Sequence, residues 1–186
     1  GAFPDNAPDG VGSWLIVHNQ EALLLEIPPG LTTAIVRAAL ANAGASLRFM
    51  TASHAHEDHL DCAVCRKLQT SFANAQFIDP SRLRADLCLE LGGEPLWLLP
   101  AKKHSMTDIV TVFRGVAMTG DIELCMVESV NHEVPKRLKV LSMKKLAGFC
   151  KQTGYHIHTV ISAHLNDLRT GVCWSHLFSV PSATAG

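Results

Sequence analysis

One short stretch of the sequence concentrates the side chains that bind transition metals. Residues 51–61 read TASHAHEDHLD and hold three imidazoles and three carboxylates within eleven residues. Neutral imidazole and carboxylate are ligands of zinc, iron and manganese in proteins. His54 and His56 are two residues apart, so on an extended segment both rings leave the same face. Asp58 and His59 follow where the chain is expected to turn toward a helix, and this spacing predicts a site for two metal ions rather than one.

The residues on either side of this stretch are expected to hold it rigidly. The preceding segment 47–53 is largely apolar and predicts a strand, and residues 58–71 predict a helix. A loop between a strand and a helix places ligands on a rigid scaffold. The alternative is a polar loop whose histidines face solvent, which is the ordinary interpretation of any single histidine. The combination of these residue types at this spacing favours the metal site.

The run HAHEDH at residues 54–59 resembles the His-x-His-x-Asp-His motif of the metallo-β-lactamase-fold superfamily. This motif is specific when further ligands follow it in order, so the remainder of the chain provides a test.

The composition is that of a globular protein. Of the 186 residues, 47% are hydrophobic and 18% are charged, which suits one domain with a substantial core and excludes a disordered chain. The formal net charge of −1 gives no general attraction for nucleic acid or an anionic membrane. Ten histidines against one tyrosine is an unusual balance that favours a metal site.

The six cysteines are expected to be free thiols. Most lie in apolar periodic segments, where cysteine behaves as a small hydrophobe, and a disulfide framework is not expected in a chain of this size. Cys62 and Cys65 form a C-x-x-C inside an expected helix, which we interpret as helix packing, with a redox role left open. The sequence has no run of 18 apolar residues and no N-terminal signal pattern, so we expect no membrane association and a cytoplasmic location.

Hydrophobic patterning predicts alternating strands and helices. The expected strands are 13–17, 21–27, 47–53, 75–79, 87–91, 95–99, 108–113, 116–119 and 156–162. One expected helix is capped by Thr32 or Thr33 and ends at Gly44, and the others are 58–71, 135–152 and 167–178. Two halves, each rich in strands and then helical, predict an α/β fold with two facing sheets and helices outside. We therefore expect a four-layer αββα sandwich of two mixed sheets in a single domain, 1–186, with a flexible N-terminal segment at 1–12.

A site for two ions needs more donors than the first stretch supplies. Each ion takes four to six donors, and a bridging carboxylate holds the two ions about 3.5–4 Å apart. His104, Asp121 and His164 each follow an expected strand, as His54 does, so one edge of the sandwich could collect them. Gly120 has no side chain and lets the backbone approach closely. Each later residue alone has an ordinary interpretation, and only their order after the first motif favours a ligand role.

The resemblance implies a role for each of these side chains. By analogy with the family, the first metal is held by His54, His56 and His104. The second metal is held by Asp58, His59 and His164, and Asp121 bridges the two. All seven positions carry the expected residue type in the expected order, and the match runs from about residue 14 to 165. His156 and His158 also form a His-x-His pair, but no Asp-His follows, so we interpret them as sheet residues.

Two features depart from the family pattern. Lys102 and Lys103 precede His104 where the family often has Pro-Gly. Asp121 stands where several true β-lactamases carry a cysteine, which argues against antibiotic hydrolysis. Lys102, Lys103 and Arg114 could attract an anionic substrate, although a solvated surface charge is the more ordinary interpretation of each.

The resemblance implies a metal-dependent hydrolase of unknown substrate. Two divalent ions are expected, zinc first, with iron or manganese as options. They would lower the pKa of a bridging water toward about 7, and the resulting hydroxide would attack an ester, thioester, lactone or phosphodiester. Asp58 is expected to have a catalytic part, because it can orient the nucleophile as well as bind metal.

Two alternatives of other classes remain open. One is a non-hydrolytic di-iron or mononuclear-iron metalloprotein that handles oxygen, nitric oxide or sulfur compounds on the same fold. The other is a partner-binding protein in which a structural metal only holds the loops together. The expected partner is a small-molecule substrate and not nucleic acid. The oligomeric state is left open, with a homodimer among the options.

Overall fold

The computed structural model describes residues 11–121, 133–161 and 163. Its strands are β1 (Trp14–His18), β2 (Glu21–Leu25), β3 (Ser46–Thr51), β4 (Gln76–Phe77), β5 (Leu87–Leu91), β6 (Glu94–Pro100), β7 (Ile109–Phe113), β8 (Val116–Met118) and β9 (Thr159–Ile161). Its helices are α1 (Thr33–Ala43), α2 (Cys62–Ser71), α3 (Lys136–Thr153) and the 3₁₀ helix η1 (Pro80–Arg82).

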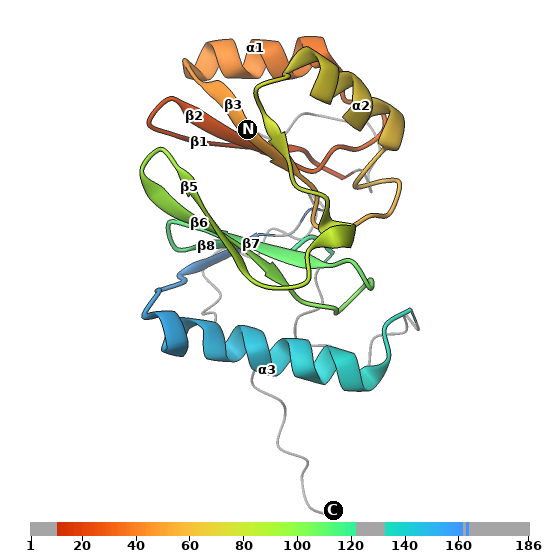
Figure 1. Cartoon of the computed structure of the whole chain (residues 1–186), viewed down its shortest axis with the longest axis vertical. Helices are drawn as coiled ribbons and strands as arrows, with labels where there is room; N and C mark the ends of the chain where they lie inside the picture. The colour runs from red at the N-terminus through yellow and green to blue at the C-terminus, as the bar shows by residue number, and fades with distance from the viewer. Residues whose placement is uncertain (1–10, 122–132, 162, 164–186) are drawn as a thin grey trace, which may run out of the picture.

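The strands form two mixed sheets that face each other. The first has the order β1-β2-β3-β4 and the second the order β5-β6-β7-β8-β9. The pairs β2–β3, β3–β4 and β8–β9 are parallel and the others antiparallel. Helices α1 and α2 cover the outer face of the first sheet, and α3 covers the outer face of the second (Figure 1). The predicted four-layer αββα sandwich is therefore confirmed.

Alternation along each strand divides the core into three layers. On β2, Leu24 packs in the cluster beneath α1 and α2, whereas its neighbours Leu23 and Leu25 pack between the sheets. On β7, Val110 and Val112 pack toward α3 in the same manner. Successive side chains of a strand leave opposite faces, so a strand with a layer on each side is apolar throughout.

Capping residues set the helix boundaries. The side chain of Thr32 accepts the Ile35 N–H, and Gly44, with φ of +60°, ends α1 as predicted. Helix α2 begins at Cys62 and not at residue 58, because the Asp61 carboxylate caps it and residues 56–60 form a separate turn. The predicted helix 167–178 and most of the predicted flexible segment 1–12 lie outside the described residues.

The cysteines of the described residues are free thiols. Cys65 is buried in the first turns of α2, and Cys62 is exposed at its start. Burial raises the pKa of the Cys65 thiol to about 11, which disfavours the reactive thiolate at neutral pH. The packing interpretation of Cys65 is therefore the one the structure supports. Among the described helices, none has the length and apolarity that a membrane span requires.

One edge of the sandwich collects the ends of four strands. Strands β2 and β3 are parallel neighbours, and β6 and β8 both run antiparallel to β7, so each pair ends on one side. A hydrogen bond from the Ile109 N–H to the Ser53 carbonyl, 2.7 Å long, joins the two sheets there.

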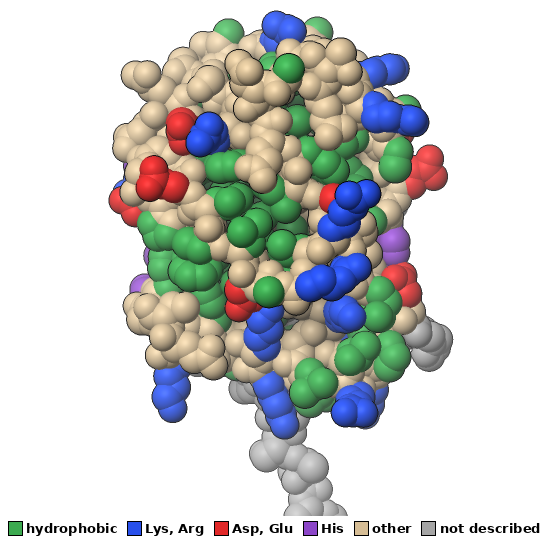
Figure 2. Space-filling model, in the orientation of Figure 1, with side chains coloured by type: hydrophobic (Ala, Val, Ile, Leu, Met, Phe, Trp, Pro, Cys, Tyr) green, Lys and Arg blue, Asp and Glu red, His purple; other side chains and the backbone are tan. Residues whose placement is uncertain are grey.

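The broad face in Figure 2 shows hydrophobic side chains across its middle and histidines only at its margins.

Candidate metal centre

Loops after β3, β6 and β8 bring the predicted ligands to this edge. One group consists of His54, His56 and His104, and a second consists of His54, His59 and Asp121. Within each group, one ligand atom of every residue lies within 4.8 Å of the others. Five of the seven predicted ligands therefore meet at one place, with His54 common to both groups.

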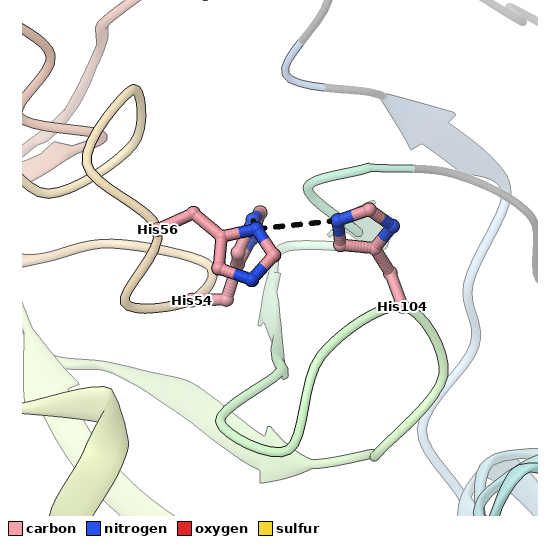
Figure 3. A group of neighbouring side chains, drawn as sticks. All are labelled: His54, His56 and His104. Atoms are coloured by element: carbon pink, nitrogen blue, oxygen red, sulfur yellow. Dashed lines mark hydrogen bonds between the residues drawn. The ribbon is translucent and has the colours of Figure 1, made fainter. Parts of the chain in front are cut away.

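Three imidazole nitrogens converge in the first group (Figure 3). His54 Nε2 lies 3.1 Å from His56 Nδ1, which lies 3.4 Å from His104 Nε2. Two nitrogen ligands of a tetrahedral zinc ion at about 2.05 Å lie about 3.3 Å apart. The two separations that involve His56 therefore match those of zinc ligands, and the nitrogens of His54 and His104 lie within 4.8 Å of each other.

Asp121 lies between the two predicted sets of ligands. Its Oδ1 is 2.9 Å from His59 Nε2, and its Oδ2 is 3.3 Å from His104 Nε2. Each carboxylate oxygen thus faces a ring from a different set, which is the arrangement expected of a bridging ligand. The His54 and His59 rings lie side by side, with their centroids 4.0 Å apart.

The other two predicted ligands are Asp58 and His164. The Asp58 carboxylate lies 3.7 Å from His59 Nε2, but its side chain is 60% exposed and it belongs to neither group. His164 lies outside the described residues. The assignment of the seven side chains as metal ligands stays a prediction, to which the geometry of five of them conforms.

The three rings of the first loop are held by groups that no sequence motif indicated. His56 Nε2 lies 2.9 Å from the Glu133 carboxylate, and His59 Nδ1 lies 3.2 Å from the Glu26 carboxylate. His54 Nδ1 lies 3.0 Å from the Ser53 hydroxyl. An acceptor at the outer nitrogen of a ring keeps the proton there, and the inner nitrogen can then present its lone pair to a metal.

Glu26 holds the ligand loop from the end of β2. The carboxylate is 1% exposed and also accepts the Ser53 N–H at 3.1 Å. Its backbone has φ of +68°, a left-handed conformation that is uncommon outside glycine. The next residue, Ile27, donates its N–H to the His59 carbonyl at 2.8 Å. A charged residue directly after the apolar run of β2 was the available sequence signal, whereas Glu133 offered none.

Buried charge distinguishes the two neighbouring rings His54 and His59. Burial lowers the pKa of His54, and the charge on His59 lowers it further, to about 3. Burial also acts to lower the pKa of His59, but hydrogen bonds to Asp121 and Glu26 outweigh it and raise that pKa to about 10. In the metal-free protein at neutral pH, His54 is therefore neutral and His59 carries a proton.

Two of the three cations considered as attractors of an anionic substrate have other roles. Lys103 is 4% exposed, and its ammonium lies 3.6 Å from the buried Asp108 carboxylate, so its interpretation as a solvated charge is wrong. Arg114 lies in the β7–β8 turn, at the far end of β7 from the centre, where it approaches His18 Nδ1 at 3.0 Å. Lys102 is half-buried.

The expected close approach at Gly120 is present. A Cβ atom at this position would collide with the Ser53 side chain, and φ is +66°. The absence of a side chain thus lets the segment that carries Asp121 lie against the segment that carries His54.

Comparisons with known proteins identify the fold. No family model matches the sequence, and no curated protein matches it. Among solved structures, ETHE1 from Myxococcus xanthus is similar with a TM-score of 0.64 and 15% identity, over 95% of this chain and 80% of that one. The BLEG-1 B3 metallo-β-lactamase is similar with a TM-score of 0.64 and 15% identity, over 96% and 97% of the two chains. An archaeal metallo-β-lactamase superfamily protein from Sulfolobus tokodaii has a TM-score of 0.54 at 12% identity, over 94% and 80%. The four-layer sandwich, with its histidine-rich strand ends, is therefore the metallo-β-lactamase fold.

Proposed function

We propose that this protein is a metal-dependent hydrolase whose centre lies at the strand ends described above. The observation that carries the proposal is the convergence of three imidazole nitrogens within 4.8 Å of one another, two of the separations being 3.1 and 3.4 Å, beside a carboxylate that faces both ligand sets. The proposed ligands of the first ion are His54, His56 and His104. Those of the second are Asp58, His59 and His164, with Asp121 between the two. The nitrogen-rich first set favours zinc over magnesium or calcium.

The divalent ions would supply Lewis-acid activation of a water and stabilisation of negative charge on a carbonyl or phosphoryl oxygen. The side chains divide into a buried half and an open half. His54 and His59 are fully buried, whereas His56 and His104 are partly exposed and form the side that a substrate can reach. The Asp58 carboxylate is 60% exposed and lies 3.7 Å from His59 Nε2, so it is available to orient an attacking water through a hydrogen bond.

The proposed substrate is a small molecule with a carbonyl or phosphorus electrophile. Esters, thioesters, lactones and phosphodiesters meet this description. The similarity to B3 metallo-β-lactamases adds a β-lactam to the compounds that need testing, although Asp121 argues against it. Lys103 is buried and Arg114 lies far from the centre, which leaves only the half-buried Lys102 of the three cations considered, so a strong preference for anionic substrates is not part of the proposal.

The proposal is tested by metal loading followed by a substrate panel. Metal-free protein is reconstituted with zinc, manganese or iron, and its metal content is measured. Each form is assayed with p-nitrophenyl esters, a bis-p-nitrophenyl phosphodiester, lactones, thioesters and a chromogenic β-lactam, with Asp121→Ala as control. We expect zinc or manganese binding and turnover of at least one class above the control. Turnover no higher than the control with every metal and every compound would contradict the hydrolase assignment, and retention of iron alone would favour the non-hydrolytic alternative.

A further inference from the structure

A buried carboxylate organises the loop that carries His104. Asp108, the residue before β7, is 1% exposed. Its Oδ2 accepts the backbone N–H groups of Lys103, His104 and Ser105, at 2.9, 2.6 and 2.9 Å. Three backbone donors aimed at one anionic oxygen form a strong, charge-assisted contact. The turn that presents the His104 ring is therefore wrapped around the Asp108 side chain.

A buried ammonium extends this contact to the second ligand loop. Lys103 Nζ lies 3.6 Å from Asp108 Oδ2 and donates to the Asp121 carbonyl at 3.1 Å. The other Asp108 oxygen lies 3.9 Å from His54 Nδ1. An ammonium or carboxylate in a protein interior needs a partner because loss of hydration is costly. These two charges supply that partner to each other and, at the same time, connect the loops of His54, His104 and Asp121.

The charge state of Asp108 is consistent with this geometry. Burial alone would raise the pKa of its carboxyl group. The Lys103 ammonium and the three backbone N–H donors outweigh burial and hold the pKa below its usual value. The carboxylate is therefore ionised at neutral pH, as its contacts require.

We propose that Lys103 and Asp108 are a positioning pair for the metal centre: Asp108 fixes the His104 loop, Lys103 fixes the Asp121 backbone, and together they set the spacing between these two ligands. The inference rests on the proposed metal centre. Neither side chain reaches the converging nitrogens, so the pair acts through His104 and Asp121. A pair that only stabilised the fold could be replaced by neutral side chains of similar size without any effect on metal binding.

The test removes the pair as a unit, so that no single charge is left buried. Full-length Lys103→Met/Asp108→Asn is compared with the unaltered protein and with Lys145→Met/Asp86→Asn, which removes an ion pair between α3 and the residue before β5. Zinc affinity is measured by competition with a chromogenic chelator, and ligand geometry by the visible absorption of the cobalt-loaded protein. We expect about a tenfold or larger loss of zinc affinity and an altered cobalt spectrum in the first variant only, which is the usual effect of losing a group that orients metal ligands.

Two further variants change only Lys103, and the second of them, Lys103→Arg, keeps both buried charges in case the first variant does not fold. Lys103→Met alone leaves the three backbone hydrogen bonds of Asp108 in place and removes the contact to Asp121. We expect a smaller, several-fold loss of affinity, with recovery in Lys103→Arg, which restores a donor. Unaltered affinity and cobalt spectra in the folded variants would overturn the positioning role. A failure of the unaltered protein itself to bind zinc or cobalt would instead remove the proposed metal centre on which this inference rests.

Discussion

The molecule carries two His-x-His pairs with the same spacing and different surroundings. His54 and His56 follow β3, and their ring centroids lie 4.5 Å apart. His156 and His158 precede β9, and theirs lie 6.4 Å apart. His54 is fully buried, and His104 completes its group. Both rings of the second pair are exposed, and His158 Nδ1 contacts the neighbouring Thr159 hydroxyl at 2.8 Å.

The difference shows that the spacing of two histidines does not make a metal site. The first pair lies at the edge where β2, β3, β6 and β8 end, so loops distant in sequence supply further nitrogens and carboxylates. The second pair lies beside the β7–β8 turn, where the His158 N–H bonds to the Gly115 carbonyl. The fold, and not the local motif, determines which pair is joined by further candidate ligands among the described residues.

Removal of each pair in turn should give the largest contrast. The free energy of zinc binding to a full set of structural ligands is about 10–16 kcal/mol. Loss of two ligands in His54→Ala/His56→Ala should therefore weaken zinc affinity by on the order of a thousandfold or more. His156→Ala/His158→Ala should bind zinc as the unaltered protein does. Metal content and chelator competition give both values. Equal losses of zinc affinity in the two variants, or a loss only in the second, would contradict a metal site at His54 and His56.

Two glycines near the two pairs provide a second contrast. Gly120 and Gly154 have φ of +66° and +70°, but only at Gly120 would a Cβ atom meet another side chain, that of Ser53. Gly154→Ala should lower the free energy of unfolding by about 1–2 kcal/mol through its left-handed backbone. Gly120→Ala should lower the free energy of unfolding by about 1–3 kcal/mol more than Gly154→Ala does, because its Cβ atom would collide with Ser53. Urea denaturation of the two metal-free variants measures the difference, and equal losses would show that the two segments do not need to lie this close.

Most of the fold could be predicted from sequence, because its signals are local. The short apolar runs of β2 and β7, the glycines of the hairpin turns and Gly44 at the end of α1 all indicated the elements that the structure has. The start of α2 was misplaced by four residues, because Asp61 competes with Asp58 as the capping residue and only the tertiary position of the ligand loop decides between them.

The clustering of side chains at this edge could be predicted where the residues follow a motif, and the residues that hold them could not. His54, His56 and His59 belong to one contiguous pattern, and His104 and Asp121 follow strands. Glu133, Asp108 and Lys103 are recognisable only from contacts made across the fold, and nothing in their sequence neighbourhoods separates them from surface charges. Lys103, which its sequence neighbourhood indicated as a solvated charge, is buried because it pairs with the Asp108 carboxylate.

A third contrast uses the proton on His59, which lies between the carboxylates of Asp121 and Glu26. The pKa of His59 is raised from 6.5 to about 10, so its contribution to stability is complete below pH 6.5 and is lost as the pH rises through about 10. In the metal-free protein, the free energy of unfolding should fall by on the order of 1 kcal/mol between pH 7 and pH 8. Denaturation at the two pH values measures this, with His156→Ala/His158→Ala as a variant that should keep the slope. A His59→Asn variant should lose it, and an unaltered protein with a flat profile would contradict the assigned proton.

The smallest effect is expected at the group that holds the most exposed ring of the first loop. Glu133 accepts from His56 Nε2 at 2.9 Å and from the Met106 N–H at 3.0 Å, so it ties the segment before α3 to two sides of the centre. Its hydrogen bond from the Met106 backbone lowers the pKa of the Glu133 carboxyl group, and His56 adds to this.

Glu133→Gln keeps the size of the side chain but loses the charge that favours a proton on His56 Nε2. Zinc affinity should fall by about tenfold, the lower end for a group that orients a metal ligand, because this carboxylate is partly solvated. The matched control is Glu57→Gln, an exposed carboxylate of the same loop, which should leave the affinity unchanged. If the two substitutions weaken binding equally, the effect of Glu133 is one of general negative charge near the centre and not of its contact with His56.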